Sequence, residues 1–152
     1  MRRAGEDVVR LDDVLRALLA ERAGLDLAEA DRARYHAALA HGSNHLVTLV
    51  AQSAELLAEA GVANPSRMLG PLLGAALDNA LRRGDAALTG PVARGDADTV
   101  RAHLAAPRSP EVRAAYVAMS RLTAVRALAA GVLTADGAEA LLDVLSSDEA
   151  PR

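Results

Sequence analysis

One long helical segment near the N-terminus constrains the fold of this chain most strongly. Residues 28–60 predict a single helix, which Gly61 closes at the position after the C-cap. Its apolar positions keep a seven-residue spacing through much of the segment: Leu39, Leu46, Val50 and Leu57. At 1.5 Å per residue, such a helix measures about 50 Å. That length exceeds most globular helices and indicates a central or intersubunit element.

The composition around this helix favours an all-α domain. The chain has 152 residues, which predicts one domain with a core of its own. Apolar residues make up 51% of it, yet Phe and Trp are absent and Tyr occurs twice. The core must therefore consist of Leu, Val and Ala, and Leu and Ala are strong helix formers. β-branched residues are scattered, and strand-like alternation never runs far.

Capping residues divide the rest of the chain into further helices. A helix from Leu11 is expected to stop at Gly24, and Pro71 should kink or break the helix that ends at Gly84. Four later helices should begin at polar caps, some of them followed by Pro at the first helical position: Asn64-Pro65, Asp96, Ser109-Pro110 and Thr134. We therefore expect a bundle of six or seven helices around one long central helix.

Charge and residue usage exclude several classes of protein. The net charge of −3 is dispersed and aromatic side chains are scarce, so we expect no nucleic-acid partner. No cysteine is present, which excludes disulfides and thiolate metal sites. We find no signal peptide and no membrane-spanning run, so we expect a cytoplasmic protein without membrane contact. Neither of the common Gly-rich nucleotide-binding motifs occurs.

The long helix carries a cluster of polar residues. At about 100° per residue, His36, Ser43 and Asn44 can line one groove, whereas His41 and His45 lie on the opposite side. The second pair is spaced i, i+4 and could hold a metal, but no third ligand follows from the sequence, so we expect no metal site. The plain alternative for His41 and His45 is a solvated or interface face. The plain alternative for the other group is a half-buried His36 and an Asn44 that bonds to a neighbouring loop.

The segment "ALTGPVARGD", residues 87–96, is unusually irregular for this chain. We expect a tight turn at Thr89, Gly90 and Pro91, followed by Arg94, Gly95 and Asp96 at a helix start. Backbone N–H groups beside an arginine suit an anionic ligand. The plain alternative is that Asp96 only caps the helix, Arg94 pairs with a nearby aspartate and the glycines turn the chain.

Two stretches in this order, "YHAALAHGSNHLVTLVAQ" and "LDNALRRGDAALTGPVARGDADTVRAHL", resemble a bacterial family. It is the uncharacterised helical domain found C-terminal to a Rossmann-like domain in NAD(P)-dependent oxidoreductases. The resemblance covers residues 31–145. It implies a fold similar to the C-terminal domains of 6-phosphogluconate dehydrogenase, ketopantoate reductase and pyrroline-5-carboxylate reductase.

The resemblance also implies roles for individual residues. His36 and Asn44 match the first motif and would be catalytic, with His36 as a general acid or hydrogen-bond donor and Asn44 orienting the substrate. Substrate-binding positions would be Ser43, Thr89, Gly90, Pro91, Arg94, Gly95 and Asp96, with Arg94 holding a carboxylate. The substrate would be a small carboxylate-bearing carbonyl or imine compound.

This resemblance sets the expected organisation of the chain. Residues 28–147 would be the substrate and dimerisation domain, residues 1–27 a tail and linker helix left from a Rossmann domain, and residues 148–152 a disordered tail. NAD(P) would bind to a Rossmann domain in cis or in trans, and none to this chain alone. A homodimer is expected. The alternatives are a stand-alone helical interaction module without catalysis and, more remotely, a metal-dependent helical protein.

Overall fold

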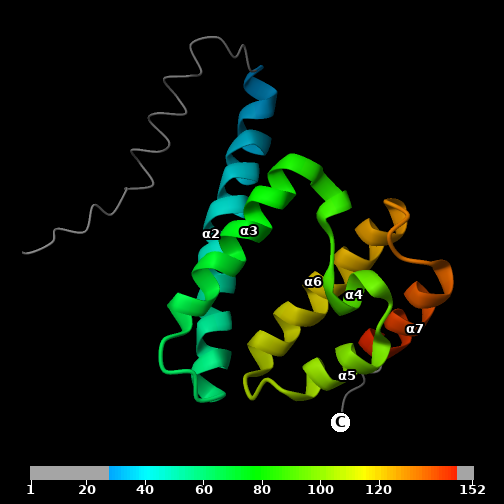
Figure 1. The fold of residues 1–152 in the computed structure, drawn as a ribbon. Coiled ribbons are helices and arrows are strands. Elements are labelled where there is room, and N and C mark those ends of the chain that lie inside the picture. The colour runs from blue at the N-terminus through cyan, green and yellow to red at the C-terminus, as the bar shows by residue number, and fades with distance from the viewer. Residues whose placement is uncertain (1–27, 147–152) are drawn as a thin grey trace, which may run out of the picture. The chain divides into compact units, whose positions relative to one another are not determined.

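The computed structural model describes residues 28–146, and this part of the chain is helical throughout its regular structure, with no strand (Figure 1). The elements are η2 Glu29–Asp31, α2 Arg32–Glu59, α3 Pro65–Arg83, η3 Gly84–Ala87, α4 Gly90–Arg94, α5 Ala97–Ala105, α6 Pro110–Ala129 and α7 Ala135–Ser146. The all-α class is confirmed. The expected helix from Leu11 and both expected tails lie outside the described residues.

The chain divides into two compact units, with the boundary inside α2 after Val47. Of the described residues, the first unit holds residues 28–47 and the second holds residues 48–146. The long helix is present, but it starts at Arg32 after the 3-10 turn η2. None of the residues of α2 is buried.

The predicted capping residues begin the helices as expected. Asn64 accepts a hydrogen bond from the Arg67 backbone N–H at 3.4 Å at the start of α3, and Pro65 follows it at the first helical position. Ser109 accepts from the Val112 N–H at 3.2 Å at the start of α6. Thr134 accepts from the Gly137 N–H at 3.3 Å beside α7. Local side chains therefore set these helix starts.

One local prediction was wrong and another was narrowed. Helix α3 continues from Pro65 to Arg83 through Pro71, so the helix does not break there, and the kink stays a prediction. The segment expected to be a turn after Thr89 contains a short helix, α4, in which Pro91 occupies the first turn. Proline is compatible with the first turn of a helix because the N–H groups there have no intrahelical partner. This irregular segment therefore forms a short helix that begins at Gly90 and ends before Gly95.

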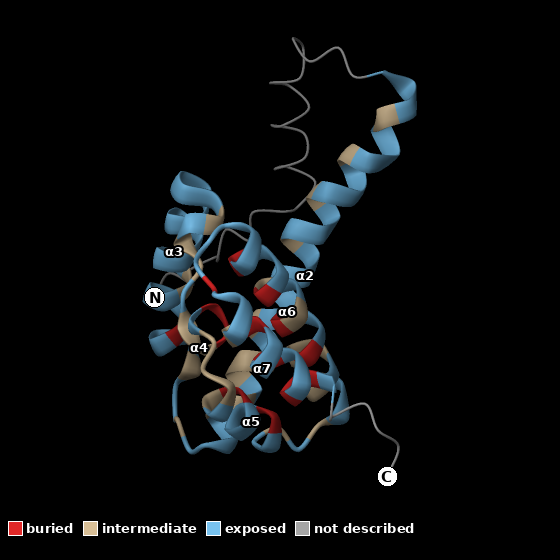
Figure 2. Ribbon diagram, turned by 90° about the vertical axis from the view of Figure 1, so that its right-hand side faces the viewer, coloured by how far each residue is buried: buried red, intermediate tan, exposed pale blue. Residues whose placement is uncertain are grey.

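The hydrophobic core lies among α4, α5, α6 and α7, where Figure 2 shows most of the buried residues. Helix α6 contacts α4, α5 and α7, and α5 also contacts α4 and α7. The core consists of aliphatic side chains from these helices and the α6–α7 turn: Val92, Ala93, Val100, Leu104, Val117, Ala124, Ala127, Leu133, Ala138, Leu141, Val144 and Leu145. Tyr116 packs against its edge as a partly buried residue. The prediction of a core built from Leu, Val and Ala is confirmed.

Two arginines of α6 bind the C-terminal ends of its neighbours. Arg113 Nη1 donates to the carbonyl of Leu104 at the end of α5, at 2.5 Å. Arg121 Nη2 donates to the carbonyl of Leu145 at the end of α7, at 3.0 Å. The last four carbonyls of a helix lack intrahelical partners and carry partial negative charge. These guanidinium groups therefore satisfy carbonyls and fix α5 and α7 against α6.

Helix α6 is apolar on two opposite faces. One face supplies Val117, Ala124 and Ala127 to the core. At about 100° per residue, Leu122 and Val125 point away from that face, and they are 58% and 63% exposed. The flanking side chains Met119 and Leu128 are exposed as well. A helix that is hydrophobic all round is typical of a buried position, so this outer face is unusual for a surface helix.

Candidate functional site

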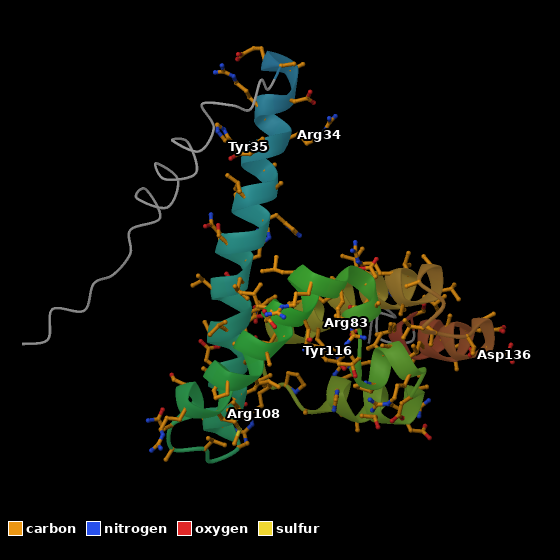
Figure 3. The ribbon with its side chains drawn as sticks, turned by 45° about the horizontal axis from the view of Figure 1, so that its top comes forward. Arg34, Tyr35, Arg83, Arg108, Tyr116 and Asp136 are labelled. Carbon is orange, nitrogen blue, oxygen red and sulfur yellow. The ribbon has the colours of Figure 1, made fainter. Side chains whose placement is uncertain are left out.

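The α2 cluster comprises His36, Ser43 and Asn44, which lie in the first unit. Tyr35, in the first turns of α2, projects from the helix beside His36, and the two ring centroids are 5.8 Å apart (Figure 3). His36 itself is exposed. Its imidazole therefore faces solvent in this chain and is accessible to a ligand.

Ser43 and Asn44 interact with each other and with their own helix. The Ser43 hydroxyl donates to the Leu39 carbonyl at 2.8 Å and lies 3.2 Å from the Asn44 side-chain oxygen, Oδ1. A serine that bonds to the carbonyl four residues earlier uses its only proton within the helix. Ser43 can therefore offer a ligand only its lone pairs unless this bond opens, whereas the exposed Asn44 side chain also carries an amide NH₂ group.

The second group of predicted residues forms the α4–α5 corner, residues 89–96, in the second unit. Thr89 precedes α4 in an extended conformation, and Gly90 opens the helix with a φ of 89°. A positive φ of this size strains any residue with a Cβ atom, which explains the glycine at that position. Pro91 follows in the first turn. These three residues form the start of α4. The backbone conformation there explains why these residue types occur, without a role in substrate binding.

Gly95 ends α4 and is required for packing. Its φ of 74° is left-handed, and its Cα lies against that of Gly137 in the first turns of α7. A Cβ atom at Gly95 would lie 3.0 Å from the Gly137 Cα and 3.2 Å from the Leu133 side chain. The two glycines thus let the corner and α7 approach through their backbones. The sequence provides no sign of this contact, because residues 95 and 137 are far apart along the chain.

Asp96 caps the N-terminus of α5. Its carboxylate accepts from the Thr99 backbone N–H at 3.0 Å and from the Thr99 hydroxyl at 2.7 Å. The hydroxyl bond, then the backbone bond, and further the positive charge of Arg94 hold the pKa of Asp96 below its ordinary value of 3.8. The carboxylate of Asp96 thus occupies the position at which an anion would meet the α5 N-terminus. This geometry matches the plain capping alternative.

Within the corner, Thr89 and Arg94 are exposed, and Arg94 is the exposed cation. Its side chain is exposed, and its charge acts on the Asp96 carboxylate across the glycine between them. A guanidinium group offers five N–H donors in a fork that suits a carboxylate. The corner therefore presents one exposed cation on a backbone that Gly95 and Asp96 fix in place.

The structure also brings together three polar residues that the sequence analysis did not select. His103 Nδ1, on α5, lies 2.9 Å from the Tyr116 hydroxyl on α6, and the two rings meet edge to face. Tyr116 also has a hydrogen bond to the buried Ser120, one helical turn later. Burial raises the pKa of Tyr116 above 10.0. No sequence signal could have paired residues on two different helices that lie 13 positions apart.

Within residues 28–146, no group of three or more His, Asp or Glu side chains could hold a metal ion. No helix of the same part is long and apolar enough to cross a membrane. His41 and His45, the pair spaced four residues apart, contact each other on α2.

Comparison with known proteins identifies one family. Residues 7–123 match a family described as Domain of unknown function (DUF2520). The matched region runs from before α2 into α6 and includes both the α2 cluster and the α4–α5 corner. Searches of curated proteins and of solved structures gave no match.

Proposed function

The chain belongs to the family of domains of unknown function DUF2520, and we propose that it acts as the substrate-binding and dimerisation domain of an NAD(P)-dependent oxidoreductase. The outer face of α6 carries this proposal. Leu122, Val125, Met119 and Leu128 expose large apolar side chains on a helix whose other face forms the core. Exposed apolar surface of this kind marks a protein interface.

A second copy of the chain fits this face well. Exposed alanines lie beside Leu122 and Val125 at positions 114, 118 and 129, so two helices can approach closely. The neighbouring Arg126 guanidinium is already bound to the Asp85 carboxylate, through Nη2 at 2.6 Å and Nε at 3.0 Å. The outer face of α6, formed by Met119, Leu122, Val125 and Leu128, is called the apolar strip below. Because Arg126 is already paired, this strip has few uncompensated charges beside it. A twofold axis at the middle of α6 would pair the strip with itself, as the commonest oligomer symmetry requires.

The catalytic part of the proposal depends on exposed polar groups. His36 would donate a hydrogen bond or a proton to a carbonyl or imine, since an imidazole ring carries N–H donors. Asn44, in the same unit, would orient the substrate. In the second unit, the exposed Arg94 is a separate candidate for binding a carboxylate group. The substrate class is a small carboxylate-bearing carbonyl or imine. The nicotinamide cofactor would be held by a Rossmann domain in cis or in trans.

Calorimetry with NADH and NADPH on the purified chain, with its mass measured by light scattering, tests the domain assignment. We expect a dimer that binds neither dinucleotide. Clear dinucleotide binding would place the cofactor site in this chain and contradict the assignment. A monomer would contradict the dimerisation role.

Turnover of the complete two-domain protein tests the site. His36→Ala and Asn44→Ala should each lower kcat/KM, and Arg94→Ala should raise KM for the carboxylate substrate. His103→Ala is the matched control, because His103 is also exposed but bonds Tyr116 on another helix. Unchanged kinetics in the His36 and Asn44 variants would rule out their catalytic role.

The same apolar face also supports the second candidate, a stand-alone helical dimerisation module. Its main support is that the α4–α7 core closes within one unit of the chain. Turnover separates the two candidates. A stand-alone module would show no turnover with any Rossmann partner, and it would dimerise equally well in the His36 and Asn44 variants.

A further inference from the structure

His41 and His45 form a close pair on the exposed surface of α2. They are spaced i, i+4, so their side chains leave the same face of the helix. Their Nδ1 atoms are 2.9 Å apart, and the ring planes are nearly perpendicular, at 89°. Both residues are exposed. The proposed substrate site uses neither of them.

The short distance between the two nitrogens defines their chemistry. In such a contact one Nδ1 carries the proton and the other presents its lone pair toward it. If that proton moves through solvent to Nε2 of its own ring, both Nδ1 atoms carry a lone pair and lie side by side on one face of the helix. This exchange changes only the tautomer, so a divalent ion that draws both lone pairs toward it can take the proton's place without any net change in protonation.

The separation matches one coordination geometry. Metal–nitrogen bonds to imidazole measure about 2.0–2.1 Å, so two nitrogens at neighbouring corners of a square lie about 2.9 Å apart. Two nitrogens of a tetrahedral site lie about 3.3–3.4 Å apart by the same arithmetic. The Nδ1–Nδ1 distance of 2.9 Å is set here by the contact between the two rings, and it equals the separation that a tetragonal ion needs. Tetragonal nitrogen and oxygen sites favour Cu²⁺ or Ni²⁺, and Cu²⁺ binds most tightly in the divalent series.

We propose that His41 and His45 form a two-imidazole chelate site for a tetragonal divalent transition metal, with Cu²⁺ as the preferred ion. The expectation of no metal site assumed tetrahedral zinc, which needs a third protein ligand. A tetragonal ion can complete its coordination with water, because the pair is open to solvent. The site is independent of the proposed oxidoreductase role.

Metal binding should also stabilise the middle of α2. The chelate links two successive turns across Gly42, and glycine disfavours a helix relative to alanine. An ion that binds the helical arrangement and not the unfolded chain shifts the equilibrium toward helix. Binding and helix content should therefore change together.

Titration of the full chain with CuCl₂, followed by calorimetry and by electron paramagnetic resonance, tests the proposal. We expect one equivalent of Cu²⁺ with two imidazole nitrogens in its spectrum. His41→Ala and His45→Ala should each weaken binding by about tenfold or more. His36→Ala and His103→Ala are matched controls, since these four are all the histidines of the chain, and both controls should bind like the unchanged protein.

Several outcomes would overturn the site. Equal affinity in the His41→Ala, His45→Ala double variant and the unchanged chain would show that the ion binds elsewhere. Loss of affinity in either control would do the same. A spectrum with one imidazole nitrogen, or no binding at micromolar protein concentration, would show that the pair does not chelate. Circular dichroism of each variant before the titration separates a lost ligand from a lost helix.

Discussion

At the scale of single residues, the α4–α5 corner is explained by backbone geometry. Gly90 and Gly95 both have positive φ, but only Gly95 lies against another backbone, at Gly137. Asp96 then caps α5 through two bonds from Thr99. The irregular composition of this segment therefore serves the fold first, and the exposed Arg94 is the group it presents to solvent.

Substitution of the two glycines separates strain from packing. Gly90→Ala should lower the free energy of unfolding by roughly 1–2 kcal/mol, the cost of a left-handed backbone with a Cβ atom. Gly95→Ala should lower it further, because its Cβ would meet the Gly137 backbone at 3.0 Å. Urea unfolding of the two variants measures the difference. An equal loss of unfolding free energy in both variants would mean that α7 shifts enough to accommodate the added methyl group at position 95.

Protonation of Asp96 should weaken the corner in acid. Its pKa is lowered in the folded chain, so the carboxylate stabilises the fold above about pH 3.8 and this contribution is lost as the pH falls through the lowered value. Asp96→Asn keeps a neutral cap at every pH. The melting temperature of the unchanged protein should exceed that of Asp96→Asn at about pH 7, and the gap should narrow as the pH falls below 3.8 through the lowered pKa. A gap that persists in acid would contradict this assignment. The bond from Ser109 lowers the pKa of Glu111 similarly, but Glu111 is present in both proteins and cancels in the comparison.

At the scale of elements, α6 organises the second unit. It contributes core residues on one face, binds the ends of α5 and α7 through Arg113 and Arg121, and exposes an apolar strip on the other face. The capping signal at Ser109 predicted where this helix starts. It could not predict that the arginines of α6 would bind carbonyls of helices that are distant in the sequence.

Removal of one arginine contact tests this organising role. Arg121→Met keeps the aliphatic stem and deletes the bond to the Leu145 carbonyl, which leaves a partly buried acceptor without its charged donor. We expect a loss of about 1–2 kcal/mol in the free energy of unfolding. Arg101→Met is the control, because among the described residues Arg101 makes an exposed pair with Asp98, and its loss should change stability by less than about 0.5 kcal/mol. Similar values for both variants would refute the capping role.

At the scale of the whole molecule, the apolar strip of α6 predicts assembly. Leu122→Glu and Val125→Glu would place a charge in the interface of the proposed dimer, so the mass in solution should fall from dimer to monomer. Ala118→Ser, on the same face, is a mild control that should leave the dimer intact. Light scattering measures the mass of each of these three variants in solution. A dimer that survives both glutamates would place the interface on another surface, such as the exposed leucines of α3.

The helical class, the aliphatic core and most helix starts of this protein could be predicted from its amino-acid sequence. These follow from local physics, because propensity, capping and the 3.6-residue period act within a few residues of each other. Only the tertiary structure decided that Gly95 meets Gly137, that His103 meets Tyr116, and that α6 keeps an apolar face exposed. Each of these depends on the approach of distant segments, which no local pattern encodes. The contact between His41 and His45 is partly predictable from the sequence. The helix sets the spacing of the two residues, whereas their side-chain rotamers set the 2.9 Å distance.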